Sequence, residues 1–257
     1  MARIGVIGLG GIGRGVVEYA TSSVEHELAF ARNRSHSDWA TQTGVPVLLG
    51  PPTEEELRET DLVVEAAHPE VVEHHGERIL RHCDFLVVSA GALADESLLS
   101  RLTETAREYG TNVIVPQGAL VGVHAMLAQS KRWTRAQITM IKSPDSLDPA
   151  PDNIDELTVL YEGAVGPLIK RYPRNVNAMV AFALATLGLE KTIAKLVCDP
   201  AADLGHLEIE LESNDGAFLF IQKAQPMHGI SGSEMTQSIL QSVSSVTGAS
   251  APGLRFA

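Results

Sequence analysis

The chain has 257 residues, of which 44% are apolar and 20% charged, and its formal net charge is −12. This composition is ordinary for a soluble globular protein, and no apolar run reaches the roughly 18 residues of a membrane span. An acidic chain lacks the basic face that nucleic acids and anionic membranes require, so we expect neither as a partner. Cys83 and Cys198 lie far apart and without metal-ligand spacing, which favours reduced packing residues in a cytoplasmic protein.

The first predicted element is a strand over residues 3–7, and it leads directly into a glycine-rich turn. An amphipathic helix over residues 12–22 follows, so the turn has the pattern G-x-G-x-x-G between a strand and a helix. There, bare backbone N–H groups at the positive end of a helix bind a pyrophosphate that a Cβ would obstruct. The alternative is a purely structural glycine turn. The predicted dinucleotide-binding residues of this turn are Gly8, Gly10, Gly11, Ile12 and Gly13.

Strands and helices continue to alternate as far as residue 116. Strands are predicted at 27–31, 45–49, 61–66, 85–89 and 112–115, and helices at 69–82 and 95–109. Continuous Val, Ile and Leu strands alternating with helices are typical of a parallel sheet covered on both faces. Ligands of such sheets bind beyond the carboxyl ends of the strands. The sequence therefore predicts an α/β Rossmann dinucleotide-binding domain over residues 1–116.

The pattern changes after Pro116, where strands follow one another without regular helical crossovers. Strands are predicted at 136–143, 156–161, 192–198, 205–212 and 217–223, and helices at 177–187 and 233–246. The first of these helices is apolar nearly all round, which indicates burial. We predict an α+β catalytic and dimerisation domain with a mixed sheet over residues 117–232, and residues 233–257 as a segment that returns to the first domain.

The end of the second predicted strand bears on which nicotinamide cofactor binds. NAD-selective sites carry an acidic residue there, whereas this chain has Asn33 between Arg32 and Arg34. A neutral amide beside a guanidinium accepts a 2′-phosphate that a carboxylate would repel. Asn33 and Arg34 therefore favour NADP while allowing NAD; the alternative is that the two arginines are solvated loop charges.

Several short motifs occur in a fixed order along most of the chain. They are Val-Glu-Ala-Ala-His-Pro-Glu at 64–70, Ser-Ala-Gly-Ala-Leu-Ala-Asp at 89–95, Gln-Gly-Ala-Leu-Val-Gly at 117–122, Tyr-Glu-Gly at 161–163, Pro-Arg-Asn-Val-Asn-Ala at 173–178, and Asp-Pro at 199–200 followed by His206. Together with the glycine turn they resemble the L-aspartate dehydrogenase family, particularly its animal-type domain-containing proteins.

The resemblance implies oxidative deamination of L-aspartate with NAD or NADP through iminosuccinate, the reverse reductive amination, and a homodimer. It also implies that Ala119 and Asn177 contact the cofactor and that His206 is catalytic. Many members have Ser or Thr where this chain has Gln117, and the bacterial type has Lys-Pro-Pro near Lys142. These departures lie near the expected substrate pocket and concern the substrate more than the chemistry.

His206 lies in a strand with clean alternation, in which Leu207, Ile209 and Leu211 share one face. His206 and Glu208 share the other, so His206 faces solvent or a cleft. Hydrolysis of an imine needs a base that works near neutral pH, which suits a histidine, and Glu208 could orient the ring. The alternative is a surface histidine beside surface glutamates.

Other residues at the predicted ligand edge have weaker signals. Asn177 begins the apolar helix, where a simple N-cap role would also explain it. A dicarboxylate needs a cationic clamp, but the sequence does not rank Lys142, Arg171, Arg174, Lys191 and Lys195. Further cofactor candidates are Ala67, His68, Ala90 and Gly91; further substrate candidates are Gln117 and Asn175. No histidine spacing indicates a metal site.

The sequence thus predicts an NAD(P)-dependent aspartate dehydrogenase. Two rivals remain: a dehydrogenase or imine reductase for another amino acid, and a catalytically silent NADPH-binding regulatory protein.

Overall fold

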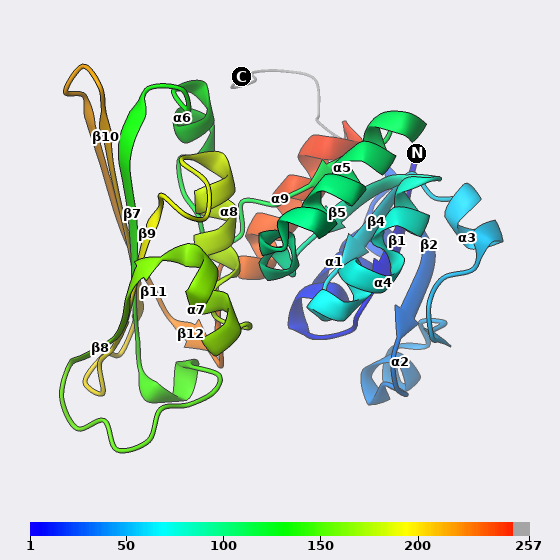
Figure 1. The fold of residues 1–257 in the computed structure, drawn as a ribbon. Helices are drawn as coiled ribbons and strands as arrows, with labels where there is room; N and C mark the ends of the chain where they lie inside the picture. Colours follow the sequence, from blue (N-terminus) through cyan, green and yellow to red (C-terminus); the bar gives the residue numbers. More distant parts are fainter. Residues whose placement is uncertain (249–257) are drawn as a thin grey trace. The chain divides into compact units, whose positions relative to one another are not determined.

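The computed structural model of the protein describes residues 1–248 (Figure 1). The chain forms two compact units. Within the described residues, the first comprises Met1–Ser89, Ser97–Pro116 and residues 236–248, and the second comprises Ala90–Glu96 and Gln117–Met235. The short segment Ala90–Glu96 thus belongs to the second unit although it lies within the first 116 residues.

The first unit is built on a six-stranded sheet of order β3-β2-β1-β4-β5-β6. Its strands are β1 (Ala2–Ile7), β2 (His26–Asn33), β3 (Leu48–Leu49), β4 (Leu62–Glu65), β5 (Asp84–Val87) and β6 (Val113–Ile114). Every neighbouring pair is parallel. The chain order reverses between β1 and β4, which is the arrangement of a Rossmann fold. The predicted fold class is confirmed.

Helices cover both faces of this sheet (Figure 1). On one face, Val16 and Val17 of α1 (Gly11–Ser22) and Ile239 and Val243 of α9 (Met235–Thr247) share a core with β1 and β4. Helix α4 (Pro69–Leu80) contacts β4 and β5, and Leu102 of α5 (Glu96–Tyr109) lies against Gly76 of α4. Two short helices, α2 (Asp38–Thr43) and α3 (Glu54–Arg58), were not expected from the sequence.

The second unit contains a five-stranded sheet of order β11-β10-β7-β9-β8. Its strands are β7 (Trp133–Lys142), β8 (Thr158–Ala164), β9 (Ile193–Cys198), β10 (Gly205–Ser213) and β11 (Phe218–Gln225). Strands β7 and β9 are parallel and the other pairs antiparallel, so the predicted mixed sheet is confirmed. A small hairpin, β12 (Met227–His228) with β13 (Ser231–Gly232), follows β11.

One face of the second sheet carries the core. Helices α6 (Val123–Ala128), α7 (Val165–Arg171) and α8 (Asn177–Ala185) lie on the same side of it (Figure 1). Alternate residues of β10, namely Leu207, Ile209 and Leu211, join α8 in this core. Six of the nine residues of α8 are buried, as its uniformly apolar sequence predicts.

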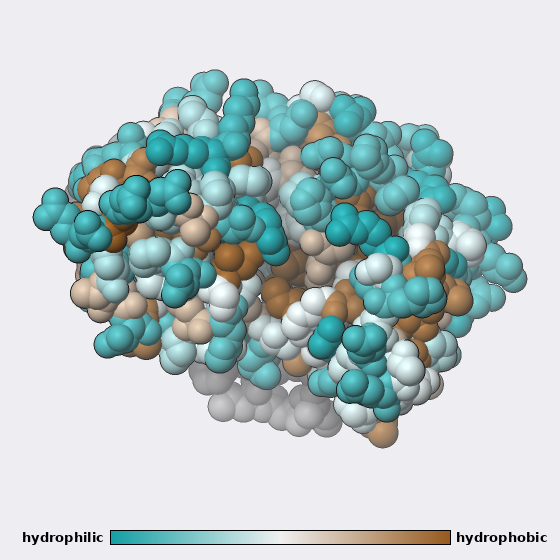
Figure 2. Space-filling model, turned by 90° about the horizontal axis from the view of Figure 1, so that it is seen from below, coloured by the Kyte–Doolittle hydropathy of each residue, from teal (hydrophilic) through white to brown (hydrophobic). Residues whose placement is uncertain are grey.

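One face of the protein is mostly hydrophilic (Figure 2). On the face shown in Figure 2, hydrophilic side chains surround separate groups of apolar residues. None of the helices within residues 1–248 combines the length and apolar character of a membrane span. Cys83 and Cys198 are free and buried, which confirms their interpretation as packing residues.

Candidate active site

The glycine turn joins β1 to α1 at the carboxyl edge of the first sheet. Gly8 has φ +95°, and a Cβ there would lie 2.6 Å from the carbonyl oxygen of Ala66. A Cβ on Gly13 would overlap the carbonyl oxygen of Gly8. Around Gly10 and Gly11 the space is open, and both residues are exposed. Gly8 and Gly13 therefore shape the turn, while Gly10 and Gly11 leave the N-terminus of α1 accessible to an anion.

The end of β2 braces this turn. Asn33 Oδ1 accepts a hydrogen bond from the Leu9 N–H at 3.4 Å, and Asn33 Nδ2 donates to the Ser35 carbonyl. Arg32 is buried and pairs with Glu56 Oε2 at 2.7 Å. It is therefore neither a cofactor ligand nor a solvated charge. Arg34 is exposed and has no hydrogen bond or ion pair within residues 1–248. Of the two arginines, only Arg34 is available to a ligand.

The loop after β4 holds Ala67 and His68. His68 is the N-cap of α4, and its Nδ1 accepts a hydrogen bond from the Glu70 N–H at 3.4 Å. Pro69 takes the first helical position, where a missing N–H costs nothing. The structure thus gives His68 a role in beginning α4. Both Ala67 and His68 are exposed at the carboxyl edge of the sheet.

A buried carboxylate lies beneath this loop. Glu65, the last residue of β4, has no exposed surface. It accepts hydrogen bonds from the Ala67 N–H at 2.8 Å, the Ser89 N–H at 3.0 Å and the Ser89 hydroxyl at 2.9 Å. Burial raises the pKa of Glu65, although these donors act in the opposite direction. Sequence analysis missed this residue; a glutamate within the apolar run Leu-Val-Val-Glu was the available signal.

In the second unit, Asn177 lies at the first position of α8 and links it to a short 3-10 helix, η1 (Ala90–Ala94). Its Oδ1 accepts a hydrogen bond from the Gly91 N–H at 2.8 Å. The N-cap of α8 is Val176, so the N-cap interpretation of Asn177 is wrong. Within residues 1–248, the Nδ2 group of Asn177 makes no hydrogen bond and is free to donate. Ala90 and Gly91 are buried in η1 rather than exposed in a turn.

The remaining polar candidates near α8 differ in availability. Asn175 is buried, and its amide ties two loop residues: Oδ1 accepts from the Asp148 N–H and Nδ2 donates to the Ser146 carbonyl. This engagement explains Asn175 without a substrate. Gln117 is half-buried in a turn closed by its own carbonyl and the Leu120 N–H. Ala119, in the same turn, packs against the core of the second unit.

Lys142 ends β7 on the helix-covered face of the second sheet. It is only 3% exposed, and its Nζ donates to the carbonyl oxygen of Ile230 at 2.9 Å. Among the described residues it has no acidic partner. Burial lowers the pKa of Lys142 to about 8. A buried ammonium with one neutral acceptor has N–H groups and charge left for an anion.

The structure ranks the five basic candidates that the sequence could not. Arg174 pairs with Asp148 at 2.6 Å and Lys195 with Glu162 at 3.0 Å, so each has a carboxylate already. Arg171 is exposed and donates to the Leu160 carbonyl, and Lys191 is exposed. Lys142 is the one candidate that combines burial with the lack of a described counter-ion.

His206 lies near the start of β10, opposite Ile141 of β7 and Ala224 of β11. It is half-buried on the sheet face that points away from the helices, and the predicted alternation of β10 is confirmed. Its ring makes no hydrogen bond within residues 1–248. Glu208 instead accepts from Gln222 Nε2 at 3.0 Å, so it does not orient the ring. His206 and Lys142 lie at the same end of the sheet but on opposite faces.

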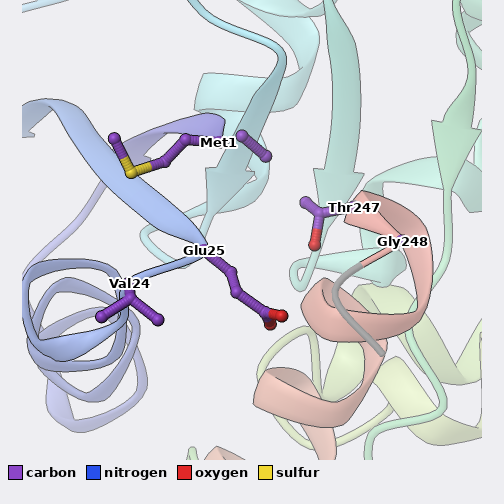
Figure 3. Close-up of a pocket in the computed structure, with 6 residues that line it drawn as sticks. Met1, Val24, Glu25, Thr247 and Gly248 are labelled. Carbon is purple, nitrogen blue, oxygen red and sulfur yellow. The ribbon is translucent and has the colours of Figure 1, made fainter. Parts of the chain in front are cut away.

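Two other features carry no catalytic group. Within residues 1–248, no three His, Cys, Asp or Glu side chains gather as metal ligands would. A shallow hollow of about 360 Å³ lies at the amino end of β1, the end opposite the glycine turn (Figure 3). Its lining comes from the start of β1, the turn before β2 and the end of α9: Met1, Ala2, Val24, Glu25, Thr247 and Gly248. Its lining includes no Lys, Arg, His or Cys side chain.

Two family models match the chain. The model described as the C-terminal region of aspartate dehydrogenase matches residues 124–245, and the NAD binding domain of homoserine dehydrogenase matches residues 8–116. The two matches fall on the mixed-sheet region and on the parallel-sheet region respectively.

Individual relatives match over most of their length. The chain is 35% identical over 228 residues to an aspartate dehydrogenase domain-containing protein of Xenopus tropicalis, covering 83% of this chain and 80% of the relative. It is 32% identical over 236 residues to an L-aspartate dehydrogenase of Methanococcoides burtonii, covering 85% and 86%. The crystal structure of aspartate dehydrogenase from Thermotoga maritima has the same fold, with a TM-score of 0.77, 22% identity and full coverage of both chains.

Proposed function

Because the chain belongs to the aspartate dehydrogenase family, we propose that it catalyses the NAD(P)-dependent oxidative deamination of L-aspartate and the reverse reductive amination. The forward reaction gives iminosuccinate, which water converts to oxaloacetate and ammonia. The observation that carries the proposal is the open glycine turn at the N-terminus of α1, where Gly10 and Gly11 leave room for a dinucleotide.

The glycine turn fits the pyrophosphate of a nicotinamide dinucleotide. The backbone of Gly10, Gly11, Ile12 and Gly13 begins α1, so its N–H groups point out of the helix end. No acidic residue occupies the first turn of α1, so nothing there repels a phosphate. When bound, the nicotinamide ring accepts or delivers the hydride of the reaction.

We assign the adenosine end of the cofactor to the residues that follow β2. The exposed guanidinium of Arg34 would pair with a 2′-phosphate, while Asn33 holds the turn and carries no charge to repel it. This pairing makes NADP the preferred cofactor, with NAD accepted because the ribose hydroxyls meet no repulsive group.

We assign the nicotinamide end to candidates in each unit taken separately: the loop after β4 in the first, and η1, the loop after β6 and the start of α8 in the second. Asn177 supplies a free amide donor, which suits an acceptor such as the carboxamide oxygen of the ring. The small side chains of Ala67, Ala90, Gly91 and Ala119 allow close approach of a ribose, and His68 closes the loop after β4.

We assign acid–base chemistry to His206 of the second unit. One ring nitrogen would take the proton of the water that adds to the imine carbon and return a proton in the reverse direction. Its ring has no partner within residues 1–248, so both nitrogens are open to substrate and water. Lys142 is our candidate for the substrate carboxylate, because an ammonium with a free N–H group is poised for an anion. Since Lys142 and His206 lie on opposite faces, both would reach one substrate only around the end of the sheet where β7 ends and β10 begins. Gln117 is a further candidate for the substrate.

The two units have different proposed roles. The first unit binds the cofactor, and the second carries catalysis and dimerisation. We further propose a homodimeric enzyme of cytoplasmic amino-acid metabolism, in keeping with an acidic chain whose two cysteines are free.

The direct test follows NADPH absorbance at 340 nm with oxaloacetate and ammonium, and then with other oxo acids in place of oxaloacetate. The proposal predicts oxaloacetate-dependent oxidation that needs ammonium, with pyruvate and 2-oxoglutarate turned over far more slowly. Preference for another oxo acid would identify a different amino-acid dehydrogenase. NADPH binding without turnover of any oxo acid would identify a regulatory protein.

A further inference from the structure

We propose that Glu65 is a positioning residue for the nicotinamide half of the cofactor. Its carboxylate holds in register the two backbone segments that follow β4 and β5. This inference deepens the proposed function and rests on it, because it concerns the same dinucleotide site.

The hydrogen-bond donors around Glu65 fit a carboxylate and few other side-chain groups. Oε1 accepts from the Ala67 N–H and the Ser89 hydroxyl, and Oε2 accepts from the Ser89 N–H. The His68 backbone N–H is a further donor to the same carboxylate. Donors thus converge on both oxygens from two different loops, and a carboxylate is acceptor-only. An amide in its place would turn its own N–H toward one of these donors.

Burying a carboxylate is a poor way to stabilise a sheet. The other residues of β4, Leu62, Val63 and Val64, are apolar and fully buried, as a central parallel strand requires. A well-packed apolar residue usually serves stability as well as a buried charge or better. The four donors therefore point to a role in fixing backbone positions rather than in holding the sheet together.

The position of Glu65 connects it to the cofactor. Glu65 lies opposite Ile7 of β1, the residue before the glycine turn, and the Ala66 N–H donates to the Ile7 carbonyl. In a Rossmann fold the first three strands bind one mononucleotide and the next three bind the other. The glycine turn and the end of β2 take the adenosine side, so the loops after β4 and β5 take the nicotinamide side. Glu65 accepts hydrogen bonds from both of those loops.

The experiment compares E65Q with the wild-type protein in binding two ligands. We expect roughly tenfold weaker binding of NADPH by E65Q, because one donor loses its acceptor and meets another donor. We expect the turnover of oxaloacetate and ammonium to fall similarly. Adenosine 2′,5′-bisphosphate, which reports only on the adenosine side, should keep its affinity within about twofold.

Two further variants keep the test decisive. S89A removes one of the donors but keeps the carboxylate, so it should show a smaller loss of NADPH affinity in the same direction and replaces E65Q if that variant does not fold. T60A is the matched control: Thr60 is also a buried polar residue of the first unit, but its hydroxyl bonds only the Glu56 carbonyl.

The outcomes separate the two hypotheses. Selective loss of NADPH in E65Q and S89A, with T60A unchanged, supports the inference. Unchanged NADPH affinity in these variants, or equal loss of NADPH and of adenosine 2′,5′-bisphosphate, overturns it. A wild-type protein that binds adenosine 2′,5′-bisphosphate but not NADPH refutes the proposed function, and this inference falls with it.

Discussion

The two units place their candidate functional groups differently. In the first unit the groups are mainly backbone N–H donors: the glycine turn at the start of α1, and loops braced by Asn33 and Glu65. In the second unit they are side chains: Asn177 on a helix, and Lys142 and His206 on neighbouring strands. A backbone site needs particular residues to permit its shape, whereas a side-chain site needs tertiary structure to bring its members together.

The two buried ionisable groups show the same contrast. Glu65 has donors on both oxygens, so little of its charge remains for a ligand. Lys142 has one carbonyl acceptor and no acidic partner in the described part of the chain. A satisfied buried charge orders its surroundings, while an unsatisfied one is suited to an anion that arrives later. This difference between Glu65 and Lys142 can be tested by measuring cofactor affinity and substrate affinity separately in variants of each.

The largest expected effect is that of H206A on turnover. Loss of the general acid–base group should lower kcat by about two orders of magnitude, since proton transfer by a positioned side chain contributes about that much. Binding of NADPH should be nearly unchanged, because the residues proposed to bind the pyrophosphate and the adenosine lie in the first unit. Steady-state kinetics and a fluorescence titration measure the two quantities. H228A, which removes an exposed histidine of the same unit, is the matched control. Near-normal turnover in H206A would contradict the assignment.

A smaller effect is expected from K142M, and it should fall on the substrate. The KM for oxaloacetate should rise by roughly tenfold to thirtyfold, because a charge-assisted contact to a carboxylate is lost. Wild-type KM should also rise above pH 8, because the pKa of Lys142 is about 8 and the neutral amine no longer attracts the anion. This pH dependence should be absent in K142M. K131M, at an exposed position, is the control.

Stability gives Lys142 an independent readout. Its folded pKa of about 8 lies below the ordinary lysine pKa of 10.5, so between these pH values the unfolded chain binds more protons than the folded one. Unfolding free energy should therefore rise with pH across that window in the wild-type protein relative to K142M. A change in stability without any change in KM would make Lys142 a structural residue and remove it from the site.

The third prediction concerns cofactor choice. R34A should weaken NADP binding by roughly tenfold and leave NAD nearly unchanged, because the proposed partner of the guanidinium is the 2′-phosphate, which NAD lacks. R81A removes another exposed arginine of the first unit and should leave the ratio of the two affinities unaltered. Equal losses of NADP and NAD affinity in R34A would mean that Arg34 does not read the 2′-phosphate.

The sequence predicted the sheets better than the side-chain contacts. Strand β4 and the alternation of β10 were predictable because burial on two faces or on one leaves a direct pattern in the residues. By contrast, Lys142 donates to the carbonyl oxygen of Ile230, which lies 88 residues further along the chain, and no local sequence pattern predicts this contact. The hydrogen-bond partners of Asn175 are Asp148 and Ser146, which lie 27 and 29 residues earlier in the chain, and no local pattern predicts them either.

Two arginines at the end of β2 and just beyond it show what a local sequence pattern cannot predict. Arg32 and Arg34 are equivalent in the sequence as neighbours of Asn33. Arg32 lies within β2 and pairs with Glu56 of α3, whereas Arg34 follows the end of the strand at Asn33 and is exposed. The capping box that begins α3 is present in the sequence as Thr53-x-x-Glu56, and the helix that follows it has only five residues.

That capping box gives the smallest expected effect. The Thr53 hydroxyl accepts from the Glu56 N–H at 3.3 Å, while Glu56 Oε2 accepts from the Thr53 N–H at 2.6 Å and pairs with Arg32. T53A should lower the unfolding free energy by about 1 kcal/mol, the usual cost of losing an N-cap side chain. It should leave kcat and both cofactor affinities unchanged, since the backbone bond and the ion pair remain. T103A removes an exposed hydroxyl that bonds only carbonyls of its own helix, and it should be nearly neutral. A change in the NADP affinity of T53A would instead mean that α3 helps to position Arg34. The cofactor site of the first unit would then depend on the contact between α3 and β2 as well as on its backbone donors.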